Sequence, residues 1–182
     1  MTWDGESYQR RIDTLAASGA LVHGEADFVA ALHPTTVLDA GCGTGRVTRE
    51  LAQRGIEAVG IDPDPSMIAT ARRLSPDLTW VEADMTGLDL GRVFDAVVMA
   101  GNVPLFTPPG TQAALVDGCA RHLRPHGTLV AGFQLDGRYS VVDYDRHCRG
   151  AGLELVERWA SWDRLPFPGP GTYAVSVHRA RT

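Results

Sequence analysis

From residue 36 onward, short apolar runs alternate with segments in which apolar residues recur at helical spacing. The apolar runs TVLDA, IEAVGID, LTWVEAD, FDAVVMAG and HGTLVAGFQL are bounded by turn residues, which predicts strands. Between them, RVTRELAQR, SMIATARRL and TQAALVDGCARHL have the period of helices. Regular alternation of this kind predicts a parallel sheet with helices on both faces and right-handed crossovers.

The last two apolar runs, LELVERWASW and TYAVSVHRA, follow a helix that we expect near VDYDRHCRG. Only nine residues join these two runs, whereas parallel strands need a crossover of about a dozen residues or more. We therefore predict an antiparallel C-terminal hairpin on an otherwise parallel sheet. The fold class is α/β, with a Rossmann-like, doubly wound sheet of seven strands.

The N-terminal 35 residues contain two further segments of helical period, SYQRRIDTLAAS and EADFVAALH. A chain of 182 residues is large enough to bury one core without disulfides or metals. We therefore predict a single domain over 1–182, in which 1–35 form a helical cap and 36–182 form the Rossmann-like core.

Three glycines, Gly41, Gly43 and Gly45, lie close together where the first expected strand ends, in VLDAGCGTGRV. A generic strand-to-helix turn needs one glycine, so the run indicates that a ligand approaches the backbone closely. In open parallel sheets, ligands bind beyond the carboxyl ends of the strands, which is where this loop lies. A dinucleotide fingerprint, GxGxxG, would require Gly at the position of Arg46. The run instead fits GxGxG.

VLDAGCGTG resembles the first motif of the class I S-adenosylmethionine-dependent methyltransferases, and the resemblance extends over about residues 36 to 135. The terminal hairpin resembles the last two strands of that family. The resemblance implies a small, minimal-core methyltransferase with S-adenosylmethionine as cofactor, in which Asp39 braces the glycine loop. The implied cofactor-binding residues are Tyr8, Arg11, Asp39, Gly41, Cys42, Gly43, Thr44, Gly45, Asp62, Pro63, Met67, Asp84, Met85, Ala100, Gly101 and Asn102.

Asp62 ends the second expected strand, seventeen residues after Gly45. A carboxylate at this position can accept hydrogen bonds from both hydroxyls of a ribose. The alternative is that Asp62 only caps the next helix, but Asp64, followed by a proline, suits that role better. Met67 would then cover the adenine.

The resemblance also implies roles for residues at the ends of the third and fourth strands. In EADM, Asp84 would accept from the exocyclic amine of the adenine, and the Met85 amide would bond a ring nitrogen. The alternative for Asp84 is that of a turn former. Ala100 and Gly101, in MAGNV, would leave room for the methionine part.

Tyr8 and Arg11 are expected to close over the cofactor carboxylate from the N-terminal segment. Cys42 lies within the glycine loop and is interpreted as a small loop residue, because direct displacement of a methyl group requires no covalent enzyme intermediate. A base is needed only if the acceptor arrives protonated, so no catalytic residue is assigned. The candidates to face the methyl group are Asn102, Asp136, Tyr139 and Tyr144, and His23 is a candidate to border the site.

Charge and composition disfavour several classes of function. The net charge is −5 and acidic and basic residues are interspersed, so no nucleic acid partner is expected. The chain has no Lys, which excludes Schiff-base and P-loop lysine chemistry. No metal is expected, because the histidines form no ligand pair on one element and Pro125 separates His122 from His126.

Three widely spaced cysteines and an N-terminus without signal-peptide features favour the cytoplasm. No apolar run approaches the roughly 18 residues that a membrane helix needs. The NVPLF run fits only loosely the NPPY-like motif of the family branch that methylates amino groups of nucleic acids and glutamine, and the match fails at the first proline, which weakens that assignment. On grounds of size and charge, a small-molecule substrate is the first choice. Trp3, Trp159 and Trp162 suit either a core or an interface, which leaves monomer and homodimer open.

Two alternatives to a methyltransferase remain. A nicotinamide (NAD(P))-dependent oxidoreductase would share the strand order up to the fifth strand, although Arg46 argues against its pyrophosphate seat. A protein of this fold that binds the cofactor or a nucleotide without turnover is the other.

Overall fold

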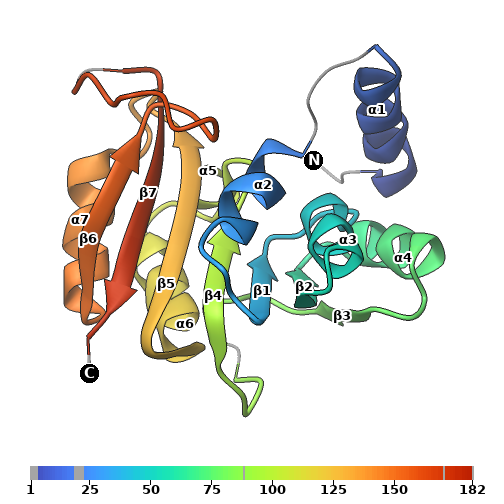
Figure 1. Ribbon diagram of the computed structural model, residues 1–182, viewed down its shortest axis with the longest axis horizontal. Helices are drawn as coiled ribbons and strands as arrows, with labels where there is room; N and C mark the ends of the chain where they lie inside the picture. Colours follow the sequence, from blue (N-terminus) through green and yellow to red (C-terminus); the bar gives the residue numbers. More distant parts are fainter. Residues whose placement is uncertain (1–3, 19–22, 88, 170, 182) are drawn as a thin grey trace.

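The computed structural model describes residues 4–18, 23–87, 89–169 and 171–181. Within these residues, seven strands form one sheet in the order β3-β2-β1-β4-β5-β7-β6 (Figure 1). The strands are β1 (Thr36–Ala40), β2 (Glu57–Asp62), β3 (Thr79–Glu82), β4 (Phe94–Met99), β5 (Leu123–Gln134), β6 (Leu153–Trp159) and β7 (Tyr173–Ala180). The helices are α1 (Gly5–Ala17), α2 (Gly24–Ala30), α3 (Arg46–Gln53), α4 (Pro65–Leu74), α5 (Val103–Phe106), α6 (Gln112–Arg121) and α7 (Val141–Gly150).

The pairing of the strands places the carboxyl ends of β1 and β4 side by side. β1 pairs in parallel with β2 and β4, and the parallel region continues to β3 on one side and β5 on the other. β7 pairs antiparallel with both β5 and β6. The predicted sheet with its antiparallel C-terminal hairpin is confirmed. Because the chain runs outward from β1 to β3 and then returns to β4, connections leave β1 and β4 in opposite directions, the usual position of a ligand.

β4 is buried on both faces, as its nearly continuous apolar sequence indicates. Val97 and Met99 belong to the apolar cluster that includes α6 and α7, whereas Ala96 and Val98 belong to the cluster that includes α2 and α3. This alternation follows from the two-residue period of a strand. The two groups of helices therefore cover opposite faces of the sheet (Figure 1).

α1 lies apart from the sheet and packs on α4 (Figure 1). It begins two residues before the predicted segment, because the Asp4 side chain caps it by accepting from the Glu6 N–H at 3.2 Å. The Gly5 N–H donates to Ser66 Oγ at 2.7 Å, and a Cβ at Gly5 would lie 2.5 Å from the Ser66 carbonyl oxygen. An ion pair of 2.7 Å joins Glu6 to Arg73. α1, the first helix of the predicted N-terminal helical cap, thus contacts the core through α4.

Two features of the fold differ from the expected pattern. A four-residue helix, α5, follows β4, and no helix was predicted there. β5 begins at Leu123, three residues before the predicted HGTLVAGFQL segment, and its pairing with β4 shifts register between Phe94 and Ala96. No helix within the described ranges is long and apolar enough to cross a membrane.

Trp159 and Trp162 are half-buried and pack against the cluster of α2 and α3. The Trp162 ring meets Phe28 edge to face, with centroids 5.5 Å apart. Gly132 on β5 makes room for this ring, since a Cβ there would overlap it. Both tryptophans therefore pack within the chain. Trp3 lies outside the described residues.

Candidate cofactor and active site

A cavity of about 690 Å³ opens at the carboxyl ends of β1, β2 and β4. Its walls are the glycine loop, the β2–α4 junction, the loop after β3, the segment from β4 through α5, and Tyr8 of α1. The volume is within the range of small-molecule sites, about 300–1,000 Å³. Of the predicted cofactor residues, the lining includes Tyr8, Asp39, Gly41, Cys42, Gly43, Thr44, Asp62, Pro63, Met67, Asp84, Met85, Ala100, Gly101 and Asn102.

The three glycines of the loop are bare for different reasons. All three have positive φ, at +79°, +55° and +82° for Gly41, Gly43 and Gly45. A Cβ at Gly41 would lie 2.5 Å from a methyl group of Val103, and a Cβ at Gly45 would overlap the Trp80 ring. A Cβ at Gly43 would instead point toward the Tyr8 ring, 3.8 Å away. Of the three glycines, only Gly43 has open space where a Cβ would lie, so only there would an added side chain intrude on a ligand rather than on the protein.

Asp62 ties the end of β2 to the glycine loop. Its Oδ2 accepts from the Gly43 N–H at 2.8 Å, and its Oδ1 accepts from the Asp64 N–H at 2.9 Å. Burial raises the pKa of Asp62. A carboxylate has about four lone-pair positions, so each oxygen keeps the capacity for a further bond. The cap of α4 is Asp64, which accepts from the Ser66 N–H at 2.8 Å, so the capping alternative for Asp62 is wrong.

Asp39 is buried at the end of β1 and holds the first turn of α3. It accepts from the Thr48 N–H at 3.1 Å and from the Thr48 hydroxyl at 2.7 Å. Burial, opposed by these bonds, raises the pKa of Asp39 to about 6. Asp39 therefore acts on the glycine loop through the helix that follows the loop.

The raised pKa of Asp39 predicts a pH-dependent stability. The folded chain binds this proton more tightly than the unfolded chain, whose carboxyl keeps its ordinary pKa of 3.8. The free energy of unfolding therefore falls as pH rises from the ordinary pKa of 3.8 to the folded pKa of about 6. Relative to Asp39→Asn, the free energy of unfolding should fall by about 3 kcal/mol in total, most of it between about pH 4 and pH 6. Urea unfolding at a series of pH values measures this difference. Parallel profiles for the two proteins would contradict it.

The Cys42 thiol packs with Ile68 and Trp80, below the glycine loop. Burial raises the pKa of this thiol well above its usual range. A neutral thiol is a weak nucleophile, so this environment agrees with a small loop residue.

Asp84 and Met85 line the cavity after β3. The Asp84 side chain is exposed and accepts from the Thr86 N–H at 2.8 Å, as a turn former does. Met85 is buried, and its carbonyl fits against α6 where Gly118 leaves no Cβ in the way. The second oxygen of Asp84 is the group that this turn leaves for the cavity.

The backbone turns sharply after β4. Gly101 and Asn102 have φ of +72° and +68°, a conformation that asparagine tolerates better than most residues. Asn102 Oδ1 accepts from the Gln134 N–H at 2.8 Å, which ties the end of β4 to the end of β5. The turn directs α5 toward the glycine loop, where Val103 fills the space beside Gly41.

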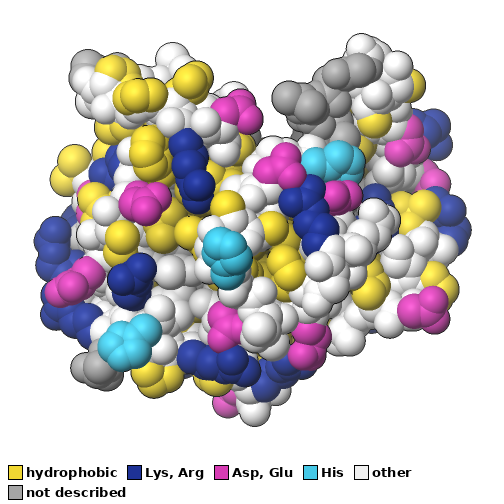
Figure 2. Space-filling view, in the orientation of Figure 1, with side chains coloured by type: hydrophobic (Ala, Val, Ile, Leu, Met, Phe, Trp, Pro, Cys, Tyr) yellow, Lys and Arg dark blue, Asp and Glu magenta, His cyan; other side chains and the backbone are white. Residues whose placement is uncertain are grey.

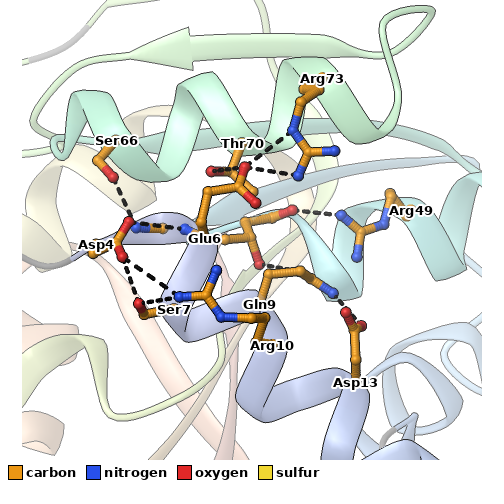
Figure 3. Close-up of polar contacts among 12 residues, drawn as sticks. Asp4, Glu6, Ser7, Gln9, Arg10, Asp13, Arg49, Ser66, Thr70 and Arg73 are labelled. Carbon is orange, nitrogen blue, oxygen red and sulfur yellow. Dashed lines mark hydrogen bonds and ion pairs between the residues drawn. The ribbon is translucent and has the colours of Figure 1, made fainter.

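α1 contacts the glycine loop through a buried glutamine (Figure 3). Gln9 Oε1 accepts from the Thr44 hydroxyl at 2.7 Å, and Gln9 Nε2 donates to Asp13 at 2.7 Å. From the other side, Arg49 of α3 donates to the Thr44 carbonyl at 2.6 Å. The helical cap and α3 thus hold the loop at the same residue. Sequence reasoning missed Gln9, because a polar residue on a short helix gives no local signal of burial.

Arg11 and Gly45 lie outside the lining. The Arg11 guanidinium is exposed and sits 5.9 Å from the centre of the Tyr8 ring. Gly45 contacts Trp80, as described above. Tyr8 lines the cavity, and burial raises its pKa.

Arg46 lines the cavity and was not predicted as a site residue. Both of its terminal nitrogens donate to the Glu25 carboxylate, at 2.5 and 2.8 Å. In the sequence, Arg46 only marked the position where a dinucleotide motif would have Gly. The remaining lining residues that sequence reasoning missed are Val47, Ile61, Asp64, Pro65, Ala83, Val103, Phe106, Thr107, Pro108 and Leu115.

Three of the four candidates to face the methyl group lie outside the lining. Tyr144 is fully buried and meets His178 edge to face, because the apolar side of α7 turns it into the core. The Tyr139 hydroxyl bonds His147 at 2.7 Å. Asp136 is paired with Arg138.

The fourth candidate, Asn102, lines the cavity. His23 also lies outside the lining and pairs with Glu50 at 3.3 Å.

No group of three or more metal-ligating side chains occurs in the part of the chain that the structure describes.

The family described as "Methyltransferase domain" matches residues 37–127. A TehB-like SAM-dependent methyltransferase from Corynebacterium glutamicum, solved by crystallography, is 33% identical to the chain. Its TM-score is 0.90, over 98% of this chain and 98% of that one. The chain belongs to the class I S-adenosylmethionine-dependent methyltransferases. The predicted family, and S-adenosylmethionine as its cofactor, are confirmed.

Curated relatives of this methyltransferase chain include two enzymes whose names give small molecules as substrates. Trans-aconitate 2-methyltransferase from Azoarcus sp. is 34% identical over 71% of this chain and 49% of its own length. dTDP-3-amino-3,4,6-trideoxy-alpha-D-glucopyranose N,N-dimethyltransferase from Streptomyces venezuelae is 33% identical over 58% of this chain and 46% of its own length. The chain thus spans about half the length of the curated relatives it matches.

Proposed function

We propose that this chain transfers a methyl group from S-adenosylmethionine to a nucleophilic atom of a small molecule. The observation that carries the proposal is the bond of 2.8 Å between the Asp62 carboxylate and the Gly43 N–H at the wall of the cavity. It joins the acid at the end of β2 to the glycine with free space in front of it. This arrangement supports a ribose at Asp62 and an amino acid chain along the glycine loop.

The charges of the lining suit a cofactor that carries positive charge. Among the described residues, four aspartates line the cavity against one arginine. That arginine, Arg46, is already paired with Glu25. Such a lining attracts a sulfonium and an ammonium group, and it disfavours the diphosphate of a nicotinamide dinucleotide. The charge of the site therefore supports the methyltransferase over the oxidoreductase.

The predicted cofactor residues divide between the two ends of the cofactor. We assign the nucleoside end to Asp62, Pro63, Met67, Asp84 and Met85. We assign the amino acid end to Tyr8, Gly41, Cys42, Gly43, Thr44, Ala100, Gly101 and Asn102. Arg11, Asp39 and Gly45 act through their neighbours: Arg11 through Tyr8, and Asp39 and Gly45 through the shape of the loop.

Bound S-adenosylmethionine supplies a methyl group on a positively charged sulfur. That sulfur is the leaving group, and it needs no acid to assist its departure. The work left to the chain is to hold the acceptor in line and to exclude water. Alignment of this kind contributes about 7–11 kcal/mol in favourable systems. Val103 and Leu115 provide apolar cavity walls against which the acceptor can be aligned. We assign no catalytic base.

The names of the relatives support a small-molecule acceptor, since they give trans-aconitate and an amino sugar nucleotide as substrates. We further propose that 1–182 act as one domain with 1–35 as a cap, in the cytoplasm, as a monomer or homodimer. On the face drawn in Figure 2, arginines are interspersed with acidic side chains, which offers no support for a nucleic acid partner.

Calorimetric titration with S-adenosylmethionine and, separately, with NADH tests the proposal. We expect binding of the first at one site per chain and no binding of the second. Isotope-labelled methyl groups should then pass to compounds in small-molecule pools. Binding of NADH alone would support the oxidoreductase. Tight cofactor binding without transfer to any pool would support the non-catalytic alternative.

A further inference from the structure

The cavity has a charged side and an uncharged side. Its aspartates lie at or just after the ends of β1, β2 and β3, and the loop that carries Asp84 packs against α6. The uncharged wall comes from α5, the residues after it and α6, and it consists of Val103, Phe106, Thr107, Pro108 and Leu115. None of these side chains carries a charge. This wall adjoins the glycine loop through the contact of Val103 with Gly41.

The cations near this wall are already paired with acids. Arg46 is held by Glu25 at 2.5 Å. Arg138 donates to the Leu105 carbonyl at 3.4 Å, but its guanidinium is paired with Asp136 at 2.6 Å. The residues outside the described ranges have no arginine or lysine side chain in the sequence. Arg46 and Arg138 are therefore each already shared with a carboxylate before an anion reaches the uncharged wall.

Removing a carboxylate or phosphate from water without a cation partner costs several kcal/mol. The nearby aspartates add repulsion. Apolar groups, in contrast, gain about 25 cal/mol for each Å² that they bury. The same acids favour a ligand with a positive charge. The energetics of this wall thus select against anions and in favour of apolar molecules that are neutral or cationic.

We propose that the methyl acceptor is an apolar small molecule with an amine or neutral hydroxyl as its nucleophile, and with no carboxylate or phosphate beside that atom. Phe106, whose side chain lines the wall and is 62% exposed, is the specificity-determining residue. This inference rests on the proposed function, because it assigns the charged side of the cavity to the cofactor.

The test uses the chain saturated with S-adenosylhomocysteine and three probes with the same alkyl chain: octylamine, octanol and octanoate. We expect octylamine and octanol each to bind at least about tenfold more tightly than octanoate, measured by calorimetry. Equal binding of the three, preference for octanoate, or binding of none of them would overturn the proposal. Failure of the proposed function is a separate result, since saturation with S-adenosylhomocysteine is measured first.

A matched pair of variants locates the effect. Phe106→Arg places a cation on the wall, and we expect it to tighten octanoate binding by about tenfold and weaken octylamine binding. Val142→Arg adds the same charge at a 73% exposed position on α7, outside the lining, and should leave the preference unchanged. Thr107→Arg serves as a second carrier of the charge if Phe106→Arg melts early. Equal shifts in both variants, or none in the wall variants, would overturn the assignment.

Discussion

Gly43→Ala is expected to weaken cofactor binding strongly in a chain that still folds, whereas Gly45→Ala is expected to destabilise the fold. An alanine at Gly43 points toward the Tyr8 ring at 3.8 Å and meets no protein atom more closely, so the folded state bears only the left-handed backbone, about 1–2 kcal/mol. Its methyl group nevertheless occupies the space that we assign to the cofactor. We expect affinity to fall by more than about a hundredfold, or about 2.7 kcal/mol.

Gly45→Ala adds a collision to the same backbone strain. Its Cβ would overlap the Trp80 ring, which is buried between α4 and the glycine loop. Overpacking of this kind typically costs about 1–3 kcal/mol beyond the strain. The total is a large share of the stability of an ordinary domain, about 5–15 kcal/mol.

Urea unfolding and calorimetry on the two variants separate these effects. The expected pattern is a folded Gly43→Ala chain with strongly reduced cofactor affinity, and a Gly45→Ala chain with a strongly lowered unfolding midpoint. If Gly43→Ala bound S-adenosylmethionine like the wild type, the open space in front of Gly43 would not be the cofactor site.

Asp62→Ala should lower cofactor affinity by more than about tenfold, because each hydrogen bond to a charged group contributes about 1.5–3 kcal/mol. The substitution removes two such bonds to the proposed ribose. It also removes the tie from the Gly43 N–H, at 2.8 Å, so the loop loses a contact that holds it in shape. Asp62→Asn keeps the size of the side chain and removes its charge, and an intermediate loss is expected.

Asp64→Ala is the matched control for Asp62→Ala. Asp64 caps α4 by accepting from the Ser66 and Met67 N–H groups, so its loss should lower stability by about 1 kcal/mol. Asp64 also lines the cavity, so affinity should fall, but by less than in Asp62→Ala, because both of these bonds lie within the helix terminus. Calorimetry and thermal melts on the two variants measure the contrast. Equal affinity of Asp62→Ala and the wild type would leave Asp62 with a structural role only.

The glycine loop shows how much of the site could be predicted from the sequence. The positions of Gly41, Gly43 and Gly45 indicated a ligand site at the end of the first strand, and the structure has a cavity there. The sequence offered one reason for all three glycines. The structure separates them, because Val103 and Trp80 come from distant segments to fill the spaces beside two of them.

The segment after β5 illustrates the opposite case. Tyr144 follows a strand end, which is the usual position of an active-site residue, and it was one of four candidates to face the methyl group. In the structure it lies on the buried side of α7 and packs against Phe133 and His178. The apolar period of α7 contained this information, but a tyrosine suits a site and a core equally well. Its side was decided by packing.

Sequence patterns alone were enough to predict the order of strands and helices, the antiparallel hairpin, the cap of α4 by Asp64 and the edge of the sheet where the site lies. These follow from local rules: the periods of two and 3.6 residues, the preferences of helix ends, and the length of chain that a crossover needs. The folded chain was needed to identify which distant partners meet at the site, such as Gln9 with Thr44 and Arg46 with Glu25. Such contacts depend on how separate elements pack against one another, and no local period of the chain encodes that arrangement.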